Sequence, residues 1–389
     1  MINYKKEAQN VLDEVIKNRR YLHENPEVGF ELPNTLKFVK EKLDEYGIEY
    51  RTDIGKSAVV AYINPNKART IALRADMDGL PVVEETGLEF QAKNDKMHAC
   101  GHDAHTSMLL GVAKVLKNHE EKINGTVKFI FQPAEELGTG SKFLCEDGVM
   151  DDVDEIIGLH VGNISTEGTV GDLVFSRGSM MACMDKFTIK IKGTGAHGAY
   201  PQASRDPVVI GSYIVTAIQE ILSREIDATE PGVITIGVFK SGSAFNIIPE
   251  EAYLEGTVRA VTNENRQFIE SRIKEVSEGI AKTFRANVEY EYFWQPPPVV
   301  NDEKIAGKLI DYAKELYPEN VKEMKKPVMG GEDFAWYLAE KPGAFFLLHN
   351  PLEIDGKCWA HHNSRFALEE SEFEKGMAVM IAYVMNELK

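Results

Sequence analysis

The chain has 389 residues, more than a single hydrophobic core usually supports, so we expect two domains. Apolar residues make up 43% and charged residues 27%, a balance typical of a globular protein and not of a disordered one. The net charge of −17 excludes nucleic acid and anionic membrane surfaces as expected partners, because both carry charge of the same sign.

The N-terminal segment and the cysteines predict a cytoplasmic location. Residues 1–22 are amphipathic and charged throughout, without the apolar core of a signal peptide. No stretch reaches the roughly 18 consecutive apolar residues of a membrane span. The cysteines lie far apart in the sequence, at Cys100, Cys145, Cys183 and Cys358. We therefore expect reduced thiols and no disulfide framework.

The first 175 residues alternate helical and extended patterns. Apolar residues recur at helical spacing over 4–24 and over 33–46, where Gly47 is a stop signal. Short apolar runs predict buried strands at 57–63, 70–75, 126–131 and 155–161, with a helix at about 103–118. Strands that alternate with helices predict an α/β sheet with covered faces.

The pattern changes after Gly178. Strands are expected at 184–193, 233–242, 251–260 and 287–294, and helices at 206–222 and 264–284. This order is β-α-β-β-α-β, a ferredoxin-like unit. Gly178 before this unit and the run Pro296–Pro298 after it are the expected hinges. Residues 299–389 return to α/β patterning, with a final helix near 370–388. We predict a large α/β catalytic domain, residues 1–178 and 296–389, with an inserted domain at 179–295.

Side chains that bind metals follow the expected strands, where each strand ends. Asp76 and Asp78 follow the strand at 70–75, the pair Glu135-Glu136 follows 126–131, and His160 ends 155–161. The segment HACGHDAH, residues 98–105, precedes a helix, and His361-His362 lie near the C-terminus. Each residue alone has an ordinary structural explanation. Together they favour a metal site, because open α/β sheets bind ligands at the carboxyl ends of their strands.

The pair Glu135-Glu136 predicts a division of roles. In extended backbone, neighbouring side chains point in opposite directions, so only one of the two can easily face a metal. Glu136 as the ligand leaves Glu135 beside the metal as a general base for an activated water.

Several segments occur in a characteristic order and spacing: ALRADMDGLP, MHACGHDAH, FQPAEE, GLHV, GTGAHGAYP, FNIIPEEAYLEGTVRA and GGEDF. Together they resemble the M20 metallopeptidase family, in its branch of N-acyl-amino-acid, hippurate and auxin-conjugate amidohydrolases. The resemblance runs from about residue 19 to the C-terminus. It implies hydrolysis of the amide bond of a small N-acyl amino acid. It also implies two divalent metal ions per subunit (Mn²⁺, Zn²⁺, Ni²⁺ or Co²⁺) and a homodimer formed through the inserted lid domain.

The resemblance also implies roles for residues of the large domain. Cys100 would bridge the two metals, and the other ligands would be His102, Glu136, His160 and His362. Glu135 would be the general base, and Asp78 would orient a metal ligand without binding the metal itself. We choose His362 over His361 because HNSRFALEE aligns best with the corresponding family segment.

Three residues of the inserted domain complete the implied site. His197 would donate to the oxyanion of the tetrahedral intermediate, often across a dimer interface, and Asn246 and Arg259 would hold the substrate carboxylate. The chain departs from the usual family pattern at Ala104 and Ala196, where glycine is common. Thr194 stands where the family often has lysine.

Other functions remain open on the sequence. An N-acetyl-diaminopimelate deacetylase shares the whole motif set. A thiol hydrolase with Cys100 as nucleophile leaves Glu136, His160 and His362 without a role. An inactive metal-binding homologue is expected to lack the general base, and Glu135 is present.

Overall fold

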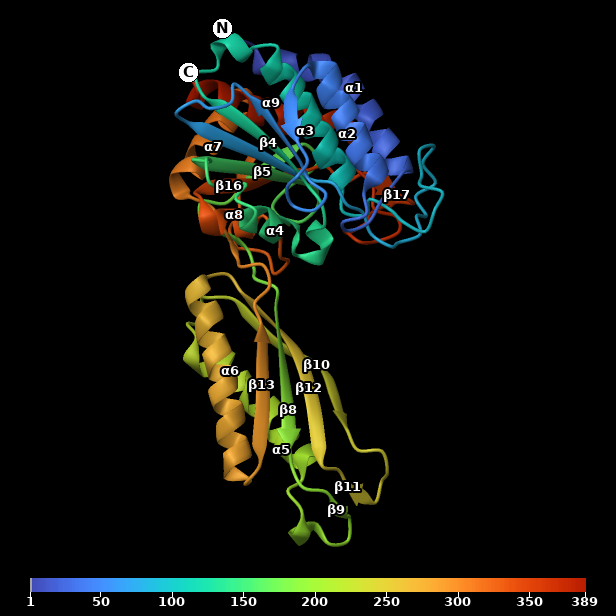
Figure 1. Ribbon diagram of the computed structural model, residues 1–389, viewed down its shortest axis with the longest axis vertical. Coiled ribbons are helices and arrows are strands. Elements are labelled where there is room, and N and C mark those ends of the chain that lie inside the picture. The colour runs from blue at the N-terminus through green and yellow to red at the C-terminus, as the bar shows by residue number, and fades with distance from the viewer. Residues whose placement is uncertain (1) are drawn as a thin grey trace. The chain divides into compact units, whose positions relative to one another are not determined.

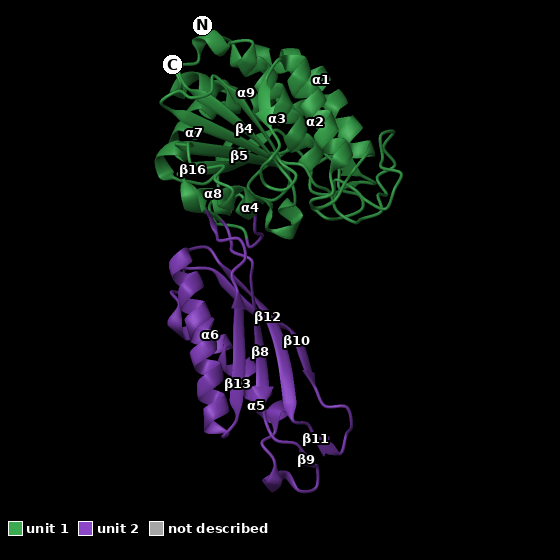
Figure 2. Cartoon of the chain, viewed as in Figure 1, with its two compact units in different colours: residues 1–180, 300–328, 333–389 green, residues 181–299, 329–332 purple. Residues whose placement is uncertain are grey.

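The computed structural model describes residues 2–389, which form two compact units (Figures 1 and 2). Unit 1 comprises the chain up to Met180 together with Val300–Val328 and Asp333–Lys389. Unit 2 comprises Met181–Val299 and Met329–Glu332. The chain therefore passes from unit 1 into unit 2 twice.

Unit 1 is built on one mixed sheet of eight described strands. In spatial order these are β1 (Glu49–Arg51), β2 (Val59–Ile63), β4 (Thr126–Gln132), β3 (Thr70–Asp76), β5 (Glu155–Gly162), β16 (Gly343–His349), β6 (Asp172–Phe175) and β15 (Val321–Glu323). The central strands β4, β3, β5 and β16 run parallel to one another, and β1 and β2 pair antiparallel with their neighbours. β6 pairs antiparallel with β16 and parallel with β15. Parallel central strands bring their carboxyl ends to one edge, which is where the candidate site residues follow them.

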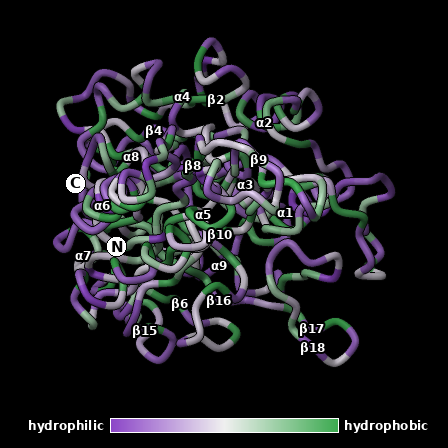
Figure 3. Tube along the Cα trace, turned by 90° about the horizontal axis from the view of Figure 1, so that it is seen from below, coloured by the Kyte–Doolittle hydropathy of each residue, from purple (hydrophilic) through white to green (hydrophobic). Residues whose placement is uncertain are grey.

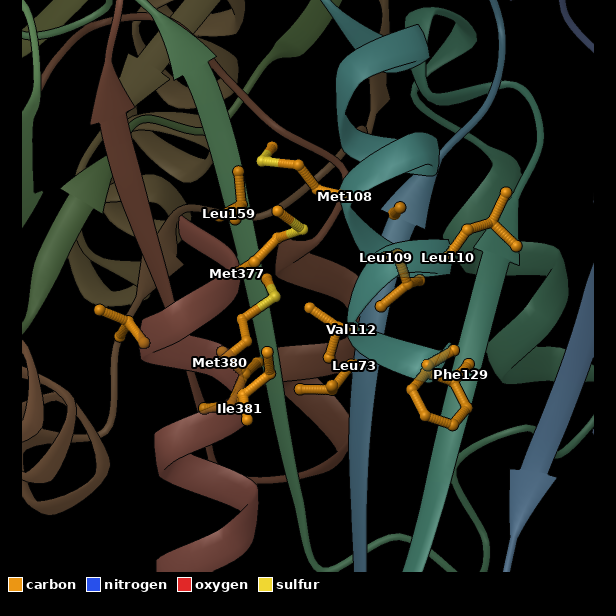
Figure 4. Close-up of a cluster of buried hydrophobic side chains, with 14 of the residues drawn as sticks. Leu73, Met108, Leu109, Leu110, Val112, Phe129, Leu159, Met377, Met380 and Ile381 are labelled. Atoms are coloured by element: carbon orange, nitrogen blue, oxygen red, sulfur yellow. The ribbon is translucent and has the colours of Figure 1, made fainter. Parts of the chain in front are cut away.

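Helices cover both faces of this sheet. One face carries α1 (Tyr4–Glu24), α3 (His102–Lys117), α7 (Glu303–Leu316) and α9 (Phe373–Glu387), beside α2 (Pro33–Tyr46). The short helices α4 (Gly140–Glu146) and α8 (Ala335–Glu340) pack against each other, and Phe334 just before α8 packs on Phe345 of β16. Figure 4 shows Met108 and Val112 of α3 facing Met377 and Met380 of α9 in the main core.

The helix ends follow local sequence signals. The side chain of Asn3 accepts a hydrogen bond from the Lys6 N–H and caps α1. Helix α2 begins with Pro33 and ends at Gly47, whose φ of 66° is left-handed, as the sequence predicts.

The remaining elements before and after the inserted segment are short. They are η1 (Glu120–Lys122), η2 (Glu135–Leu137), β7 (Ser179–Met181), β14 (Val299–Val300), β17 (Glu353–Ile354), β18 (Lys357–Cys358) and η5 (Glu370–Glu372). The hydropathy-coloured trace shows hydrophobic and hydrophilic segments interleaved along the chain (Figure 3). Within residues 2–389, no helix combines the length and the apolar character needed to cross a bilayer.

Unit 2 has the predicted β-α-β-β-α-β order. Its strands are β8 (Asp185–Lys192), β10 (Gly232–Ser241), β12 (Glu251–Ala260) and β13 (Asn287–Phe293), and its helices are α5 (Pro207–Ala217) and α6 (Asn263–Thr283). The sheet order is β10-β12-β8-β13, with every neighbouring pair antiparallel. The predicted helix at 206–222 is divided: α5 ends at Ala217, residues 219–220 are helical again, and the π-helical turn η4 covers Ile221–Glu225.

A buried ion pair stands at one end of the unit 2 sheet. Both carboxylate oxygens of Asp185 accept hydrogen bonds from Arg266 over 2.6 Å, and the Tyr292 hydroxyl and Gln295 N–H also donate to this carboxylate. At the other end, the chain forms the small ribbon β9 (Ala196–His197) and β11 (Ile247–Ile248), with the turn η3 (Pro201–Ala203) nearby (Figure 1).

Candidate metal centre

The segment between Cys100 and His102 turns sharply into helix α3. Gly101 precedes the helix with a left-handed φ of 88°, and a Cβ there would lie 2.4 Å from Cγ2 of Val161. Only glycine suits both the conformation and the close approach. His102 is the first residue of α3, so this turn places a buried thiol and a buried imidazole side by side at the sheet edge.

Two sets of donor atoms share the Cys100 thiol. Cys100, His102 and His160 form one set, and Cys100, Glu136 and His362 form the other, with the donor atoms of each set within 4.8 Å of one another. The Cys100 Sγ lies 3.4 Å from Nε2 of His160, and Nε2 of His362 lies 3.4 Å from Oε2 of Glu136. The structure thus brings all five sequence-predicted ligands together.

The imidazole of His160 is in the protonation state that a metal ligand needs. Its Nδ1 donates a hydrogen bond to the carbonyl of Val161 over 2.8 Å, which leaves the proton off Nε2, the nitrogen that faces Cys100. Burial, followed by the neighbouring His105, holds the pKa of His160 well below its usual range. A neutral imidazole with its ring fixed by a backbone carbonyl is the form that binds metals.

His105 has a different place in the network. Its Nε2 accepts a hydrogen bond from the Val161 N–H over 2.9 Å, so its Nδ1 carries a proton, which it donates to Asp76 over 2.6 Å. Both ring nitrogens are therefore used. His105 holds Asp76 and the backbone next to His160 in place, and it is not a member of the donor sets around Cys100.

The His361-His362 doublet divides between two partners. Nε2 of His361 donates to the Val161 carbonyl over 2.9 Å, whereas His362 belongs to a donor set with Cys100 and Glu136. The side chain of His362 is 57% exposed, while that of Glu136 is 8% exposed. The second donor set is therefore open to solvent on the His362 side.

The Glu135-Glu136 pair does not have the extended backbone that the sequence argument assumed. Ala134 is left-handed, with φ 56°, and turns the chain into the 3₁₀ turn η2. Asp78 stabilises this turn, because its two carboxylate oxygens accept the N–H groups of Glu135 and Glu136 over 3.0 and 3.3 Å. Both glutamates consequently approach His102, at 3.9 Å for Glu135 and 4.0 Å for Glu136.

The donors fit divalent cations. Both ring nitrogens of His102 and Oε1 of Glu136 are buried without a well-formed hydrogen bond, an arrangement that is costly unless a ligand completes it. Burial and then the Glu136 charge raise the pKa of the Cys100 thiol well above its ordinary value. Burial, only partly offset by His102, raises the pKa of Glu136 to about 7. Cations at these donors would favour the thiolate and carboxylate forms.

Behind the metal-site residues lies a buried hydrogen-bond network around Arg74, which the sequence pattern did not predict. Arg74 of β3 donates to Asp76 over 2.9 Å, to Gln132 over 2.9 Å and to Asp333 over 2.8 Å. Arg74 and His102 hold the pKa of Asp76 well below its usual range, against the opposing effect of burial. A charged residue inside the apolar run TIALRA was the available signal, because a buried arginine needs partners.

The residues predicted from the inserted domain lie in unit 2, at its two ends. His197 of β9 pairs with Ile247 of β11, and the Asn246 carbonyl accepts the Gly198 N–H over 2.8 Å. Arg259 lies near the opposite end of β12 and contacts the Thr257 hydroxyl and the Val258 carbonyl.

The length of β12 separates these groups. The stretch from Glu251 to Arg259 alone spans about 27 Å at about 3.4 Å per residue. Asn246 and Arg259 of one chain therefore lie too far apart to bind one carboxylate together, and their expected role in holding the substrate carboxylate stays a prediction.

Comparisons with known proteins match this geometry. Residues 72–386 match peptidase family M20/M25/M40. The chain belongs to the M20 peptidase family. It is 38% identical over 364 residues to the N-acetyl-L-cysteine deacetylase of Bacillus subtilis, covering 93% of this chain and 85% of the relative. It is 35% identical over 388 residues to the hippurate hydrolase of Campylobacter jejuni, covering 98% and 99%.

A solved M20 structure extends the match to the whole fold. A Bacillus subtilis protein described as a dinuclear metal-binding peptidase from the M20 family superposes with a TM-score of 0.83, at 32% identity, over 98% of this chain and 99% of that one. The resemblance and the two-part α/β fold predicted from the sequence are confirmed. This M20 family member is a metal-dependent hydrolase of the amidohydrolase type.

Proposed function

We propose that this enzyme hydrolyses the amide bond of small N-acyl amino acids. Cys100, His102, Glu136, His160 and His362 would hold two divalent metal ions, with Cys100 shared between them. The observation that carries the proposal is the overlap of the two donor sets at one thiol beside a further carboxylate, Glu135. The relatives that act on N-acetyl-L-cysteine and on hippurate support a substrate with an acyl group and a free carboxylate.

Divalent ions bound at such donors act as Lewis acids and can lower the pKa of water from 15.7 to about 7. Glu135 supplies the base. Its carboxylate is buried at 8% exposure and lies on the same side of η2 as the donors, with Oε2 3.9 Å from Nε2 of His102. Glu135 takes the proton of the attacking water and then delivers it to the nitrogen of the leaving amine.

Asp78 and His105 hold this arrangement in place. Asp78 accepts the N–H groups of Glu135 and Glu136, so it fixes the base and the Glu136 donor together. His105 links Asp76 to the N–H of Val161, next to His160. Groups of this kind orient ligands and are typically worth about 10–100-fold in metal affinity or activity.

His197 is suited to donate a hydrogen bond to an oxyanion. Its Nδ1 accepts the Ala199 N–H over 3.1 Å, so the proton is on the exposed Nε2. Because His197 and Asn246 lie at the far end of unit 2 from Arg259, we propose that His197 and Asn246 act at the metal site of a second copy of the chain. The enzyme would then be a homodimer with shared active sites.

We propose that the enzyme is cytoplasmic, because the reducing conditions of the cytoplasm keep cysteines as thiols. All four cysteines among the described residues are unpaired, including Cys100 of the donor sets. An oxidised Cys100 could not bind a metal as a thiolate.

The test is a hydrolysis assay on chelator-stripped protein, with and without Mn²⁺, Co²⁺, Ni²⁺ or Zn²⁺. The panel contains N-acetyl amino acids, hippurate, an indole-acetyl amino acid and N-acetyl-diaminopimelate. We expect metal-restored cleavage of N-acyl amino acids and a ranking of the acyl groups. Cleavage that proceeds equally without metal would contradict the mechanism and favour Cys100 as a nucleophile.

A further inference from the structure

Asp333 is an acidic residue with a fully buried side chain near the candidate base. It is the first residue of unit 1 after the segment Met329–Glu332, which belongs to unit 2. Its carboxylate accepts hydrogen bonds from Arg74 over 2.8 Å, from Gln132 over 2.8 and 2.9 Å, and from the Ser141 N–H over 3.0 Å. These donors come from β3, the end of β4 and the first turn of α4, so one carboxylate is anchored to three elements.

The backbone of Asp333 is anchored as well. Its carbonyl oxygen accepts the Ser141 hydroxyl over 2.7 Å. The start of α4 reaches this position because Gly140 packs on the Pro133 carbonyl, where a Cβ would approach that oxygen to 1.8 Å. Because its side chain and its carbonyl are both held, the Cα of Asp333 is anchored on two sides, and this restrains the N–H group attached to that Cα.

That N–H points at the candidate base. It donates to Oε1 of Glu135 over 3.3 Å, while the N–H of Glu135 donates to Asp78 over 3.0 Å. Glu135 is thus held at its backbone by one acidic residue and at its carboxylate by the backbone of another. The other oxygen, Oε2, lies toward His102.

We propose that Asp333 is a positioning residue for Glu135: its anchored carboxylate directs its own N–H, which holds the base with Oε2 toward the metal donors. The inference rests on the proposed function of Glu135. It explains why a buried carboxylate outside the two donor sets around Cys100 accepts four hydrogen bonds, from Arg74, Gln132 and the Ser141 N–H. A base must be placed closely, because a displacement of about 1 Å can cost about 100-fold in rate.

The first test is Asp333→Asn, which conserves volume. The new NH₂ group must face N–H donors of Gln132, Ser141 or Arg74, so the anchor loosens. We expect kcat to fall about 10- to 100-fold with KM changed less than about threefold, because the substrate and metal contacts remain. Metal content, measured by mass spectrometry of the purified protein, should equal that of the wild type.

A double-mutant cycle separates positioning from general loosening of the fold. If Asp333 acts through Glu135, then Asp333→Asn should change kcat by less than about twofold in a Glu135→Gln background. Independent losses that multiply in the double variant would overturn the inference.

Tyr337→Phe is the matched control. The Tyr337 hydroxyl donates to Oε1 of Gln132 over 2.9 Å, so the variant removes a buried hydrogen bond from the same network and keeps the donors to the Asp333 carboxylate named above. We expect Tyr337→Phe to lower the melting temperature and leave kcat within about twofold. A kcat loss as large as that of Asp333→Asn would contradict a specific role of Asp333.

Two further outcomes can be told apart from a failure of the inference: a variant that does not fold, and a wild-type protein that cleaves no amide. If Asp333→Asn does not fold, the cycle is run with Ser141→Ala, which removes only the hydroxyl bonded to the Asp333 carbonyl. A kcat loss that vanishes in the Glu135→Gln background supports the inference, and no loss or a multiplying loss overturns it. Wild-type protein that binds metal but cleaves no amide would instead contradict the proposed function.

Discussion

The N–H of His362 donates a hydrogen bond to the carbonyl oxygen of Ala99 over 2.8 Å. This contact joins the C-terminal loop to the residue before Cys100. His362 has a left-handed backbone, with φ 65°, at this junction. The turn places its ring next to Glu136, while the ring of the preceding His361 is bonded to Val161. Two adjacent histidines thus acquire different environments from one backbone turn.

The first prediction concerns this doublet. His362→Ala should lower the number of bound metal ions per chain from about two to about one, because only the open donor set loses a ligand. His361→Phe is the control: it removes the hydrogen bond to Val161 but no member of a donor set. It should keep both ions. Metal analysis after dialysis measures both variants, and equal metal loss in the two would contradict the assignment of His362.

The second prediction concerns the base. Glu135→Gln keeps the shape of the side chain and its acceptor for the Asp333 N–H but cannot take a proton. We expect kcat to fall about 10²- to 10⁴-fold with metal content unchanged. Glu136→Gln should differ, because Glu136 belongs to a donor set and its loss should also reduce metal content. Activity of Glu135→Gln close to wild type would rule Glu135 out as the base.

The third prediction tests shared active sites. His197→Ala and Glu135→Gln should each be nearly inactive alone. If His197 serves the second copy of the chain, a hybrid dimer has one intact site, and an equal mixture after subunit exchange should regain about a quarter of wild-type activity. The measurement is activity against mixing ratio, with the two variants incubated separately as the control. A mixture that stays inactive after exchange would place His197 at its own chain's site or outside catalysis.

The fourth prediction concerns a buried cluster on the other side of α3. Nδ1 of His23 lies 2.7 Å from Asp103, Nε2 lies 3.1 Å from Glu84, and Arg19 also pairs with Asp103 at 2.8 Å. Burial and Arg19 act to lower the pKa of His23, but the two carboxylates outweigh them, and the pKa is raised above 6.5. The imidazolium therefore stabilises the folded state.

The sign of the pH dependence follows from that direction. A raised folded-state pKa gives stability that is fully present below the unfolded value of about 6.5 and is lost as the pH rises through the raised value. His23→Gln should therefore cost about 3 kcal/mol at pH 6, and the difference from wild type should shrink as the pH rises. Urea unfolding at pH 6 to 9 measures this. A difference that stays constant with pH would show that His23 is neutral in the folded protein.

Much of the fold was predictable because it rests on local patterns. The apolar spacing of residues 4–24 matches α1, and Gly47 ends α2 as a left-handed cap. The alternation in the inserted segment predicted its strand and helix order, because period-two and period-3.6 patterns are properties of short stretches. The helix predicted at 206–222 is interrupted at Ile218 and continues into the π-helical turn of Ile221–Glu225, and apolar spacing does not register such a break.

The candidate site was predictable in its residue types and not in its geometry. Polar groups at successive strand ends pointed to one edge of the sheet, as the overlap of the two donor sets at Cys100 now shows. The backbone of Glu135 was wrongly taken as extended, because the left-handed Ala134 and the two hydrogen bonds that Asp78 accepts depend on a distant strand end. Arg74 and Asp333 likewise meet only after β3 and the start of α8 are packed together.

By itself, the sequence determined the family, the two-part α/β architecture and the set of metal-binding residue types, because each is written in motifs and periodicities of a few residues. Only the tertiary structure decided that His361 binds the Val161 carbonyl, that His105 has both ring nitrogens occupied, and that Asn246 and Arg259 lie far apart on one unit. These outcomes depend on distances between segments that are remote in the chain. Such distances are set by packing and strand length, and no local pattern encodes them.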